Sequence, residues 1–300
     1  MILLTGAGGK TGRNLVRVLS KVNNVCAFAY REEYVPVLES LGAEKVLIGD
    51  MRDESAIHSA MQGVRSVYHI CPNMDPDEEE IGKLVIDAAR VAGVEHLVYH
   101  SVLHPQTEKM HHHWSKLRVE EMIFESGLPF TILQPAPYMQ NLLAGWKSIV
   151  EEGALRVPYS VASKFSFVDL EDIAEAAKIV LTEPNHLNAI YELGGTIPLS
   201  HVEVAEIFSR VLKRDVHAKK EEIRDWRLRA DIAPEWWRSS KGSQSKRDKY
   251  AMENLIRMFE YYDRWGLVGN PNVLRWLLNR EPTSLESFIE RIVKERNATH

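Results

Sequence analysis

The sequence predicts an α/β fold, with a doubly wound parallel sheet and a smaller, mostly helical C-terminal lobe. Three observations support this prediction. Short apolar segments alternate with amphipathic segments through the first two hundred residues, a glycine-rich turn follows the first apolar segment, and the alternation stops near residue 200. Repeated strand–helix alternation is typical of parallel sheets, because right-handed crossovers place helices on both faces.

The expected strands are apolar runs rich in Val, Ile, Leu and aromatic residues, which is typical of strands buried on both faces. They are Ile2–Thr5, Val25–Tyr30, Lys45–Ile48, Ser66–Ile70, His96–His100, Phe130–Leu133 and Ala189–Leu193. Between them we expect helices over Asn14–Ser20, Ile81–Ala92 and Lys116–Glu125. In the second of these, Val85, Ala88, Ala89 and Ala92 have the i, i+3, i+4, i+7 spacing of a helix packed on a sheet.

The chain divides into a nucleotide-binding domain over residues 1–155, to which residues 160–195 return, and a mainly helical lobe over 196–300. In that lobe Ser200 is the expected N-cap of a helix over Val202–Leu212. Residues 238–249 are polar, basic and almost free of apolar side chains, which favours a mobile surface loop. A lid over a pocket and a segment that binds phosphate or a partner are the alternatives.

The turn TGAGGKTG decides which nucleotide is expected. A P-loop requires G-x-x-x-x-G-K-[ST], and Gly9-Lys10-Thr11 would then need a glycine at position 4, which is Leu4. Gly6, Gly9 and Gly12 instead have the placement of a dinucleotide-binding turn between a first strand and a helix. There the glycines allow a tight turn, approach of the pyrophosphate and close helix–strand packing. The sheet is therefore expected to be of the Rossmann type.

NADP(H) is favoured over NAD(H) by the residue that ends the second strand. An acidic residue there would hold the ribose 2′-hydroxyl of NAD, but this chain has Arg31, which can pair with a 2′-phosphate. Lys10 and Thr11 lie in the glycine turn, where Lys10 could add a second positive charge. Glu32 and Glu33 follow Arg31 and weaken the case, so a solvated Arg31 stays an alternative.

Two further loops belong to the same expected cofactor site. Asp50 and Met51 follow the third strand, with the carboxylate placed to accept from the adenine amino group and Met51 packing on the ring. Ile70 and Pro72 follow the fourth strand, where the chain passes the ribose. Cys71 lies between them, and nothing nearby in the sequence lowers its pKa, so a reactive thiol is not favoured.

Composition excludes several classes of function. The chain has 300 residues, 45% hydrophobic and 26% charged, with a net charge of −5, so no basic excess points to nucleic acid. No apolar run is long enough for a membrane span, and the first strand leaves no room for a signal peptide. Two cysteines form no disulfide framework or zinc set, so a reduced, cytoplasmic protein is expected.

The motifs together resemble the NmrA-like group of atypical short-chain dehydrogenases. The similarity lies in TGAGGKTG, YREE, GDMRD, HWSKLRVEEMIFESGLPFTILQPAPYMQNLL and FVDLEDIA, and near the C-terminus in YYDRWGLVGN and LLNREPT. It covers nearly the whole chain. The resemblance implies a Rossmann-type domain, a small C-terminal lobe, and a substrate or effector cleft between them.

The chain departs from the wider family at the catalytic motif. Typical short-chain dehydrogenases have Tyr-x-x-x-Lys, whereas His112 stands four residues before Lys116. The Lys116–Pro129 spacing resembles the isoflavone-reductase-like branch, which also lacks the tyrosine and retains a lysine. Lys116 therefore resembles the retained lysine, which binds ribose hydroxyls or assists proton transfer, and Ser101 resembles the family's serine at the cleft edge. A surface lysine is the alternative.

Histidines and a proline-rich loop provide the other catalytic candidates. His111, His112 and His113 are adjacent, so they project in different directions and are not expected to chelate a metal. His112 or His113 could instead work as an acid or base, because an ordinary histidine pKa suits that role, but a satisfied or solvent-exposed histidine is the favoured interpretation. Pro135 belongs to an extended loop where the nicotinamide would lie, and Tyr138 could line the pocket or donate a proton.

Two functions stay open on the sequence alone. One is an NADPH-dependent reductase of a small quinone, enone, imine or carbonyl compound. The other is a non-catalytic NADP(H)-binding redox sensor that acts through a protein partner, because the missing tyrosine fits that role equally well. The aromatic residues Trp146, Tyr159, Trp236 and Trp237 weakly favour a flat or aromatic ligand. Neither the substrate nor the oligomeric state is fixed by the sequence.

Overall fold

The computed structural model describes residues 1–228 and 245–298, so Trp236 and Trp237 lie outside the described residues. The chain forms two compact units. Unit 1 consists of residues 1–135 and 170–192, and unit 2 of residues 136–169 and 193–300. The sequence placed residues up to 155 in the first domain, whereas residues 136–169 group with the second unit.

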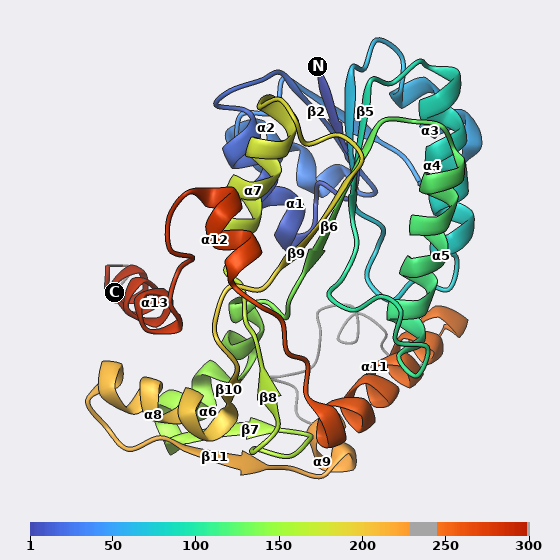
Figure 1. The fold of residues 1–300 in the computed structure, drawn as a ribbon. Coiled ribbons are helices and arrows are strands. Elements are labelled where there is room, and N and C mark those ends of the chain that lie inside the picture. Colours follow the sequence, from blue (N-terminus) through green and yellow to red (C-terminus); the bar gives the residue numbers. More distant parts are fainter. Residues whose placement is uncertain (229–244, 299–300) are drawn as a thin grey trace. The chain divides into compact units, whose positions relative to one another are not determined.

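A seven-stranded sheet forms the centre of unit 1 (Figure 1). Its strands are β1 (Ile2–Leu4), β2 (Val25–Ala29), β3 (Lys45–Ile48), β4 (Ser66–His69), β5 (His96–His100), β6 (Phe130–Pro135) and β9 (Ala189–Leu193). The order is β3-β2-β1-β4-β5-β6-β9, and β1 pairs in parallel with both β2 and β4. The predicted doubly wound parallel sheet is therefore confirmed. The strand order reverses between β1 and β4, where sheets of this kind open a crevice at their carboxyl ends.

Helices cover both faces of this sheet, as Figure 1 shows. On one face lie α3 (Glu54–Ala60), α4 (Glu78–Val91) and α5 (His111–Glu125), and on the other lie α1 (Lys10–Leu19), α2 (Val35–Ser40) and α7 (Leu170–Thr182). The expected stripe on α4 is correct for Val85, Ala88 and Ala89, which are fully buried. A Cβ added at Gly82 would come within 2.7 Å of Val119, so α4 and α5 approach closely at this glycine.

Burial of the strands differs between the centre and the edges of the sheet. Every residue of β1, β2 and β5 is buried, as their apolar sequences predicted. The edge strands are different, because Ile48 of β3 and Ile190 of β9 are 40% and 47% exposed. The expectation that all strands are buried on both faces was therefore wrong for the two edges, where no neighbouring strand shields the chain.

Unit 2 combines helices with two short sheets. Its elements are η2 (Met139–Gly145), α6 (Trp146–Glu152), β7 (Ala154–Val157), β8 (Lys164–Phe165), β10 (Leu199–Ser200), α8 (His201–Leu212), β11 (His217–Lys220), α9 (Ile223–Leu228), α11 (Lys246–Trp265), α12 (Asn272–Leu278) and α13 (Leu285–Asn297). β8 pairs antiparallel with β10, and β7 pairs in parallel with β11. Ser200 caps α8 through a capping box with Glu203, which confirms the predicted cap.

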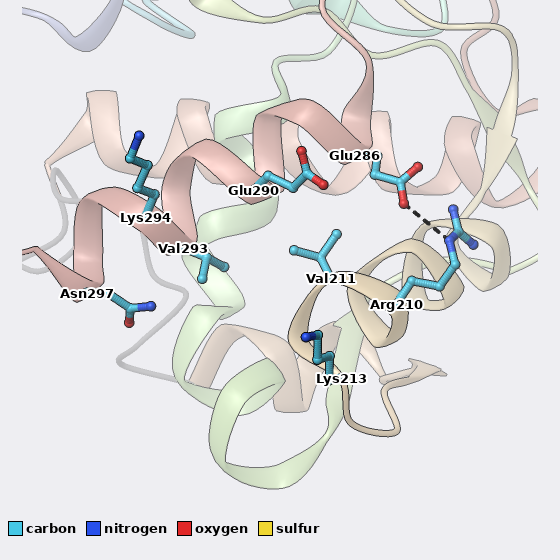
Figure 2. A pocket seen from close by; sticks show the side chains of 8 residues that line it. All are labelled: Arg210, Val211, Lys213, Glu286, Glu290, Val293, Lys294 and Asn297. Carbon is cyan, nitrogen blue, oxygen red and sulfur yellow. Dashed lines mark hydrogen bonds and ion pairs between the residues drawn. The ribbon is translucent and has the colours of Figure 1, made fainter.

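Helices α8 and α13 border an open groove of about 470 Å³ (Figure 2). Its rim contains the ion pair between Arg210 and Glu286, with Lys213, Glu290 and Lys294 nearby. Tyr159 packs among other rings of unit 2: its ring contacts Phe165, Phe259, Tyr262 and His201. Trp146 contacts Phe208, so both of the described aromatic candidates contribute to packing within this unit.

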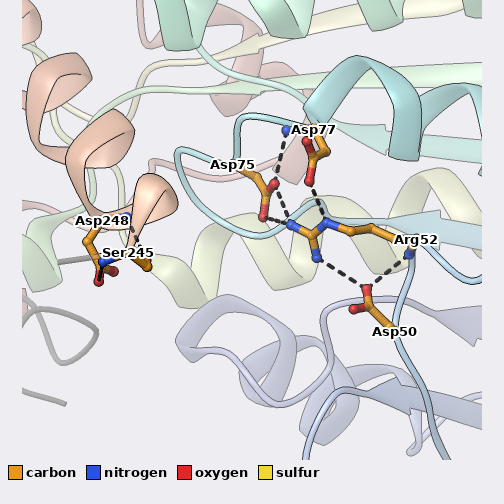
Figure 3. Close-up of polar contacts among 6 residues, drawn as sticks. All are labelled: Asp50, Arg52, Asp75, Asp77, Ser245 and Asp248. Carbon is orange, nitrogen blue, oxygen red and sulfur yellow. Dashed lines mark hydrogen bonds and ion pairs between the residues drawn. The ribbon is translucent and has the colours of Figure 1, made fainter. Parts of the chain in front are cut away.

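The polar segment 238–249 is only partly described. Residues 238–244 lie outside the described ranges, whereas Ser245 caps α11 and forms a capping box with Asp248 (Figure 3). Residues 246–249 therefore open a helix and are not part of a loop, which corrects that part of the prediction. In the described ranges, no helix combines the length and the apolar character that a membrane span requires.

Candidate functional site

The glycine turn between β1 and α1 is folded tightly on itself. Gly6 has φ +63°, a left-handed conformation that favours glycine, and an added Cβ would lie 2.8 Å from the carbonyl oxygen of Ile70. An added Cβ at Gly12 would lie 2.3 Å from the carbonyl oxygen of Gly6. The two glycines therefore allow α1 to approach β1 and the loop after β4 to touch the turn.

The N-terminus of α1 has the features of an anion site. Gly9 is the N-cap and provides no side-chain cap, and the first turn of α1 contains no acidic residue. Lys10 is exposed and Thr11 is half-buried beside it. A helix N-terminus attracts negative charge, so the turn fits a pyrophosphate. Leu4 lies in β1 and not in the turn, so the first glycine that a P-loop requires is absent.

Arg13 and Tyr34 cover one side of the glycine turn, and the sequence analysis missed both. The Arg13 guanidinium lies 5.2 Å from the centre of the Tyr34 ring, and its Nε donates to the carbonyl oxygen of Gly8 at 2.8 Å. An added Cβ at Gly8 would collide with the Tyr34 ring at 2.3 Å. A glycine at position 8 therefore allows the Tyr34 ring to pack against the turn. The spacing of the glycines in the motif did not predict this contact.

Arg31 lies just after β2, where a 2′-phosphate was expected. Its side chain is 53% exposed, and Nη1 lies 3.1 Å from Glu33 Oε1. The hydrogen bond to Glu33 raises the pKa of Arg31, so the guanidinium carries its charge. Of the two glutamates that follow Arg31 in the sequence, Glu33 pairs with it.

Asp50 and Met51 lie in the loop after β3. Asp50 is half-buried, and its Oδ1 accepts hydrogen bonds from the Arg52 backbone at 3.0 Å and from Arg52 Nη1 at 3.2 Å. Met51 is only 8% exposed and belongs to the hydrophobic core around Phe28 and Ile57. Most of the Met51 side chain thus packs inward. Less of its surface is available to an adenine ring than the sequence suggested.

Thr5 joins the glycine turn to the loop after β4. Its hydroxyl accepts from the Ile70 backbone at 2.9 Å and lies 2.8 Å from His69 Nδ1. Burial, followed by the positive charge of Lys116, lowers the pKa of His69 to about 3, so this imidazole is neutral. Pro72 is half-buried in the same loop, while burial raises the pKa of Cys71 and makes its thiol a poor nucleophile.

Lys116 is buried in unit 1 and paired. Its Nζ lies 3.0 Å from Glu78 Oε1 and 3.3 Å from the carbonyl oxygen of His100, and it lies 5.3 Å from the centre of the Tyr99 ring. The Tyr99 hydroxyl donates to the same Glu78 oxygen at 3.0 Å. The alternative of a surface lysine is therefore wrong, because Lys116 is only 6% exposed.

His112 lies one turn before Lys116 on α5, and both His112 and His113 are buried. Burial, followed by the charge of Lys116, lowers the pKa of His112 well below its usual value. Burial likewise lowers the pKa of His113 to about 4. Both imidazoles are thus neutral near neutral pH, which differs from the ordinary pKa that the sequence analysis assumed. Within residues 1–228 and 245–298, no group of three or more His, Cys, Asp or Glu side chains could hold a metal ion.

Ser101 follows β5 and contacts a second buried carboxylate. Its hydroxyl donates to Glu120 Oε1, and Gln134 Nε2 donates to the same carboxylate at 2.9 Å and 3.0 Å. Burial raises the pKa of Glu120, although the hydrogen bonds from Ser101 and Gln134 act in the opposite direction. Lys116 and Glu120 are four residues apart on α5, so both buried side chains share one face of that helix.

Unit 1 contains all of the expected cofactor residues from Gly6 to Pro135. Pro135 ends β6, and its carbonyl oxygen accepts from the Leu103 backbone at 2.9 Å. Tyr138 belongs to unit 2, where its backbone pairs with Val168. The carboxylates of Glu78 and Glu120 were missed by the sequence analysis, although the acidic opening of α4 was visible in the sequence.

The chain matches a known protein family over most of its length. A sequence profile described as the NmrA-like family matches residues 1–289. The chain belongs to the NmrA-like family. The resemblance drawn from the sequence motifs is thereby confirmed.

The chain is also similar in sequence to proteins named as reductases. The chain is 31% identical to an NAD(P)H azoreductase from Xenophilus azovorans over 218 residues, covering 72% of this chain and 75% of that protein. It is 29% identical to quinone oxidoreductase 2 of Escherichia coli over 197 residues, covering 65% of this chain and 68% of that protein.

Solved structures share the NmrA-like fold over almost the full length. An NADPH-dependent quinone oxidoreductase from Escherichia coli, complexed with NADPH, superposes with a TM-score of 0.80 at 24% identity and covers 98% of this chain and 100% of that chain. NmrA, a negative transcriptional regulator in complex with NAD, gives a TM-score of 0.74 at 19% identity, covering 99% and 97%. At these identities the comparison shows the fold and nothing further.

Proposed function

We propose that this protein binds NADP(H) in unit 1 and reduces a small conjugated or carbonyl compound, such as a quinone, enone or imine. The observation that carries the proposal is the buried Lys116, held by Glu78 beside the end of β5, in the same unit as the glycine turn after β1. The carboxyl ends of parallel strands lie at one edge of the sheet, which is the edge where dinucleotides bind in such folds.

Different residues of unit 1 would bind different parts of the nucleotide. Gly6, Gly9 and Gly12 would shape the turn for the pyrophosphate, and Asp50 would accept a hydrogen bond from the adenine amino group. Lys116 would donate hydrogen bonds to the nicotinamide ribose, with its charge balanced by Glu78. When bound, NADPH supplies the hydride, and the protein's contribution is orientation and electrostatics.

In typical short-chain dehydrogenases the tyrosine donates a proton to the substrate, and this chain lacks that tyrosine. His112 stands at that position, and burial keeps its imidazole neutral, so it is a poor acid near neutral pH. Hydride transfer to a quinone or a polarised alkene needs little general acid, because the product anion is stabilised by conjugation. The named activities of the azoreductase and quinone reductase relatives support acceptors of this kind.

The charges around the adenosine end support a preference for NADP(H). Arg31 is exposed and charged, Lys10 is exposed on the glycine turn, and the side chain at position 31 is not acidic. A planar guanidinium can bind a 2′-phosphate through two parallel hydrogen bonds. This arrangement supports recognition of the 2′-phosphate rather than a free 2′-hydroxyl.

The second candidate function is a redox sensor that binds the same nucleotide without turnover. It is favoured by the loss of the catalytic tyrosine at His112 and by the neutral state of that imidazole. A sensor would bind oxidised and reduced nucleotide with different affinities and report the difference to a protein partner.

One experiment separates the two functions. Binding of NADP+ is measured by calorimetry, and NADPH oxidation is followed with a panel of quinones, enones, imines and aldehydes, for the wild type and for Lys116→Ala. A reductase gives turnover that Lys116→Ala abolishes while the matched control Lys83→Ala, an exposed lysine on α4, retains it. Tight binding without turnover on any acceptor favours the sensor, and no nucleotide binding overturns both.

A further inference from the structure

The loop after β3 and the loop after β4 are joined by one arginine. Arg52 Nη2 contacts both carboxylate oxygens of Asp75, at 2.6 Å and 2.7 Å, and its Nε donates to Asp77 Oδ2 at 2.6 Å (Figure 3). Nη1 donates to Asp50 Oδ1 at 3.2 Å. A single guanidinium thus holds three carboxylates from two loops, with geometry that only its planar fork of donors allows.

The carboxylates around Arg52 stabilise its positive charge. Burial works against it, but the hydrogen bonds to Asp77 and Asp75 more than offset that effect and raise the pKa of Arg52. The Asp75 side chain is completely buried, whereas that of Arg52 is 32% exposed. Without Arg52, three neighbouring carboxylates would repel one another and Asp75 would be left as a buried charge.

The segment from Asp75 to Glu78 connects this arginine to Lys116. Asp75 and Asp77 bind Arg52, and Glu78, the next residue and the first of α4, binds Lys116. Asp75 Oδ1 also accepts from the Asp77 backbone at 3.0 Å, which fixes the turn just before the helix. A shift of these four residues would therefore move both the carboxylate that pairs with Lys116 and the partners of Arg52.

Asp50 completes the connection on the adenosine side. Its Oδ1 receives two hydrogen bonds from Arg52, one from the backbone and one from the guanidinium. These bonds fix the orientation of the Asp50 carboxylate, the group assigned to the adenine amino group in the proposed function. Arg52 therefore holds a residue at one end of the proposed cofactor site and, through residues 75–78, the partner of a residue at the other.

We propose that Arg52 is a positioning residue that couples the adenosine end of the cofactor site to the Glu78–Lys116 pair. The proposal rests on the proposed binding of NADP(H) in unit 1. Occupancy at Asp50 would stabilise the arrangement of Arg52, Asp75 and Asp77, and that arrangement keeps Glu78 in place against Lys116. Each end of the site then binds its half of the nucleotide more tightly when the other is held in position.

The test is a double-mutant cycle on nucleotide affinity, measured by calorimetry at a temperature where every variant is folded by circular dichroism. The proteins are the wild type, Arg52→Gln, Glu78→Gln and the double variant, with NADP+ and 2′,5′-ADP as ligands. The matched control is Arg65→Gln, because Arg65 also forms an arginine–carboxylate pair, 2.7 Å from Glu95, but is 74% exposed. Arg52→Lys provides a variant that retains the charge without the fork.

Coupling predicts that Arg52→Gln and Glu78→Gln each weaken NADP+ binding roughly tenfold, and that the double variant loses far less than the product of the two. Arg52→Lys recovers only part of the loss, and Arg65→Gln changes nothing. Losses that multiply in the double variant, or an Arg52→Gln affinity equal to that of Arg65→Gln, overturn the coupling while leaving the proposed function intact. A wild type that binds neither ligand overturns both.

Discussion

Lys116 and Glu78 form a buried ion pair, with Nζ 3.0 Å from Oε1 and side chains that are 7% and 1% exposed. They lie 38 residues apart on the neighbouring helices α5 and α4. Burying either charge alone would cost free energy, and the ion pair offsets part of that cost for both residues. The pair explains how a lysine expected to bind ribose can be buried.

The first prediction concerns Glu78→Gln. The substitution preserves shape but leaves Lys116 as a buried cation without a carboxylate, so the free energy of unfolding should fall by about 3 kcal/mol. Urea denaturation followed by circular dichroism measures the change. Glu79→Gln is the matched control, because Glu79 is the exposed neighbour in the first turn of α4. Equal stability of Glu78→Gln and Glu79→Gln would show that the pair is not a significant structural contact.

The second prediction contrasts two glycines of the same turn. In Gly12→Ala the new Cβ would lie 2.3 Å from the Gly6 carbonyl oxygen. Because the clash is with backbone, the turn must shift, and we expect the free energy of unfolding to fall by about 1–3 kcal/mol. In Gly9→Ala the nearest atom is 3.4 Å away, so the fold should persist while NADP+ affinity falls. Thermal unfolding and calorimetry measure the two effects. A stable Gly12→Ala protein would contradict the close packing of α1 on the turn.

The core of the fold was predictable because its signals are local. The strands centred on Leu3, Ala27 and Val98 are short apolar runs flanked by polar turns, and the Ser200 cap precedes its helix directly. The exposure of Ile48 and Ile190 was not predictable, because a run of apolar residues does not reveal which strand ends up at an edge. Strand order is a property of the whole sheet.

The candidate site was predictable only where one segment carries the signal. Gly6, Gly9 and Gly12 belong to one turn, so their spacing was informative. The Glu78–Lys116 pair joins segments 38 residues apart, and Arg52 reaches Asp75 across 23 residues, so no spacing rule reveals either contact. Both depend on which helix neighbours which strand, and this is settled only by the folded sheet.

The third prediction is a pH effect at His96, which lies at the start of β5. The Thr131 hydroxyl donates to the His186 carbonyl oxygen at 2.6 Å, so His96 Nε2, 2.8 Å from that hydroxyl, must be the donor. Burial, followed by the charge of His186, lowers the pKa of His96 from 6.5 to about 4. The unfolded chain therefore binds an extra proton below pH 6.5, and the stability present above that pH is lost as the pH falls towards 4.

His96→Gln tests this effect, because the glutamine amide can still donate to Thr131 but cannot titrate. The decline in unfolding free energy between neutral and mildly acidic pH should become shallower by about 1 kcal/mol per pH unit. Urea denaturation at several pH values provides the slopes. Parallel slopes for the variant and the wild type would show that burial does not suppress protonation of His96.

The fourth prediction concerns the choice between NADP and NAD. Arg31→Ala removes the cation after β2, so NADP+ affinity should fall at least about tenfold, the loss of roughly one charge-assisted hydrogen bond, while NAD+ affinity changes little. Glu33→Gln should act in the opposite direction on NADP+, because it releases the Arg31 guanidinium from its contact at 3.1 Å. Calorimetry of the wild type and both variants with each nucleotide measures the affinities. Equal losses for NADP+ and NAD+ in Arg31→Ala would show that Arg31 does not select the nucleotide. That role would then pass to Lys10 or Arg13, the cations at the start of α1 beside the glycine turn.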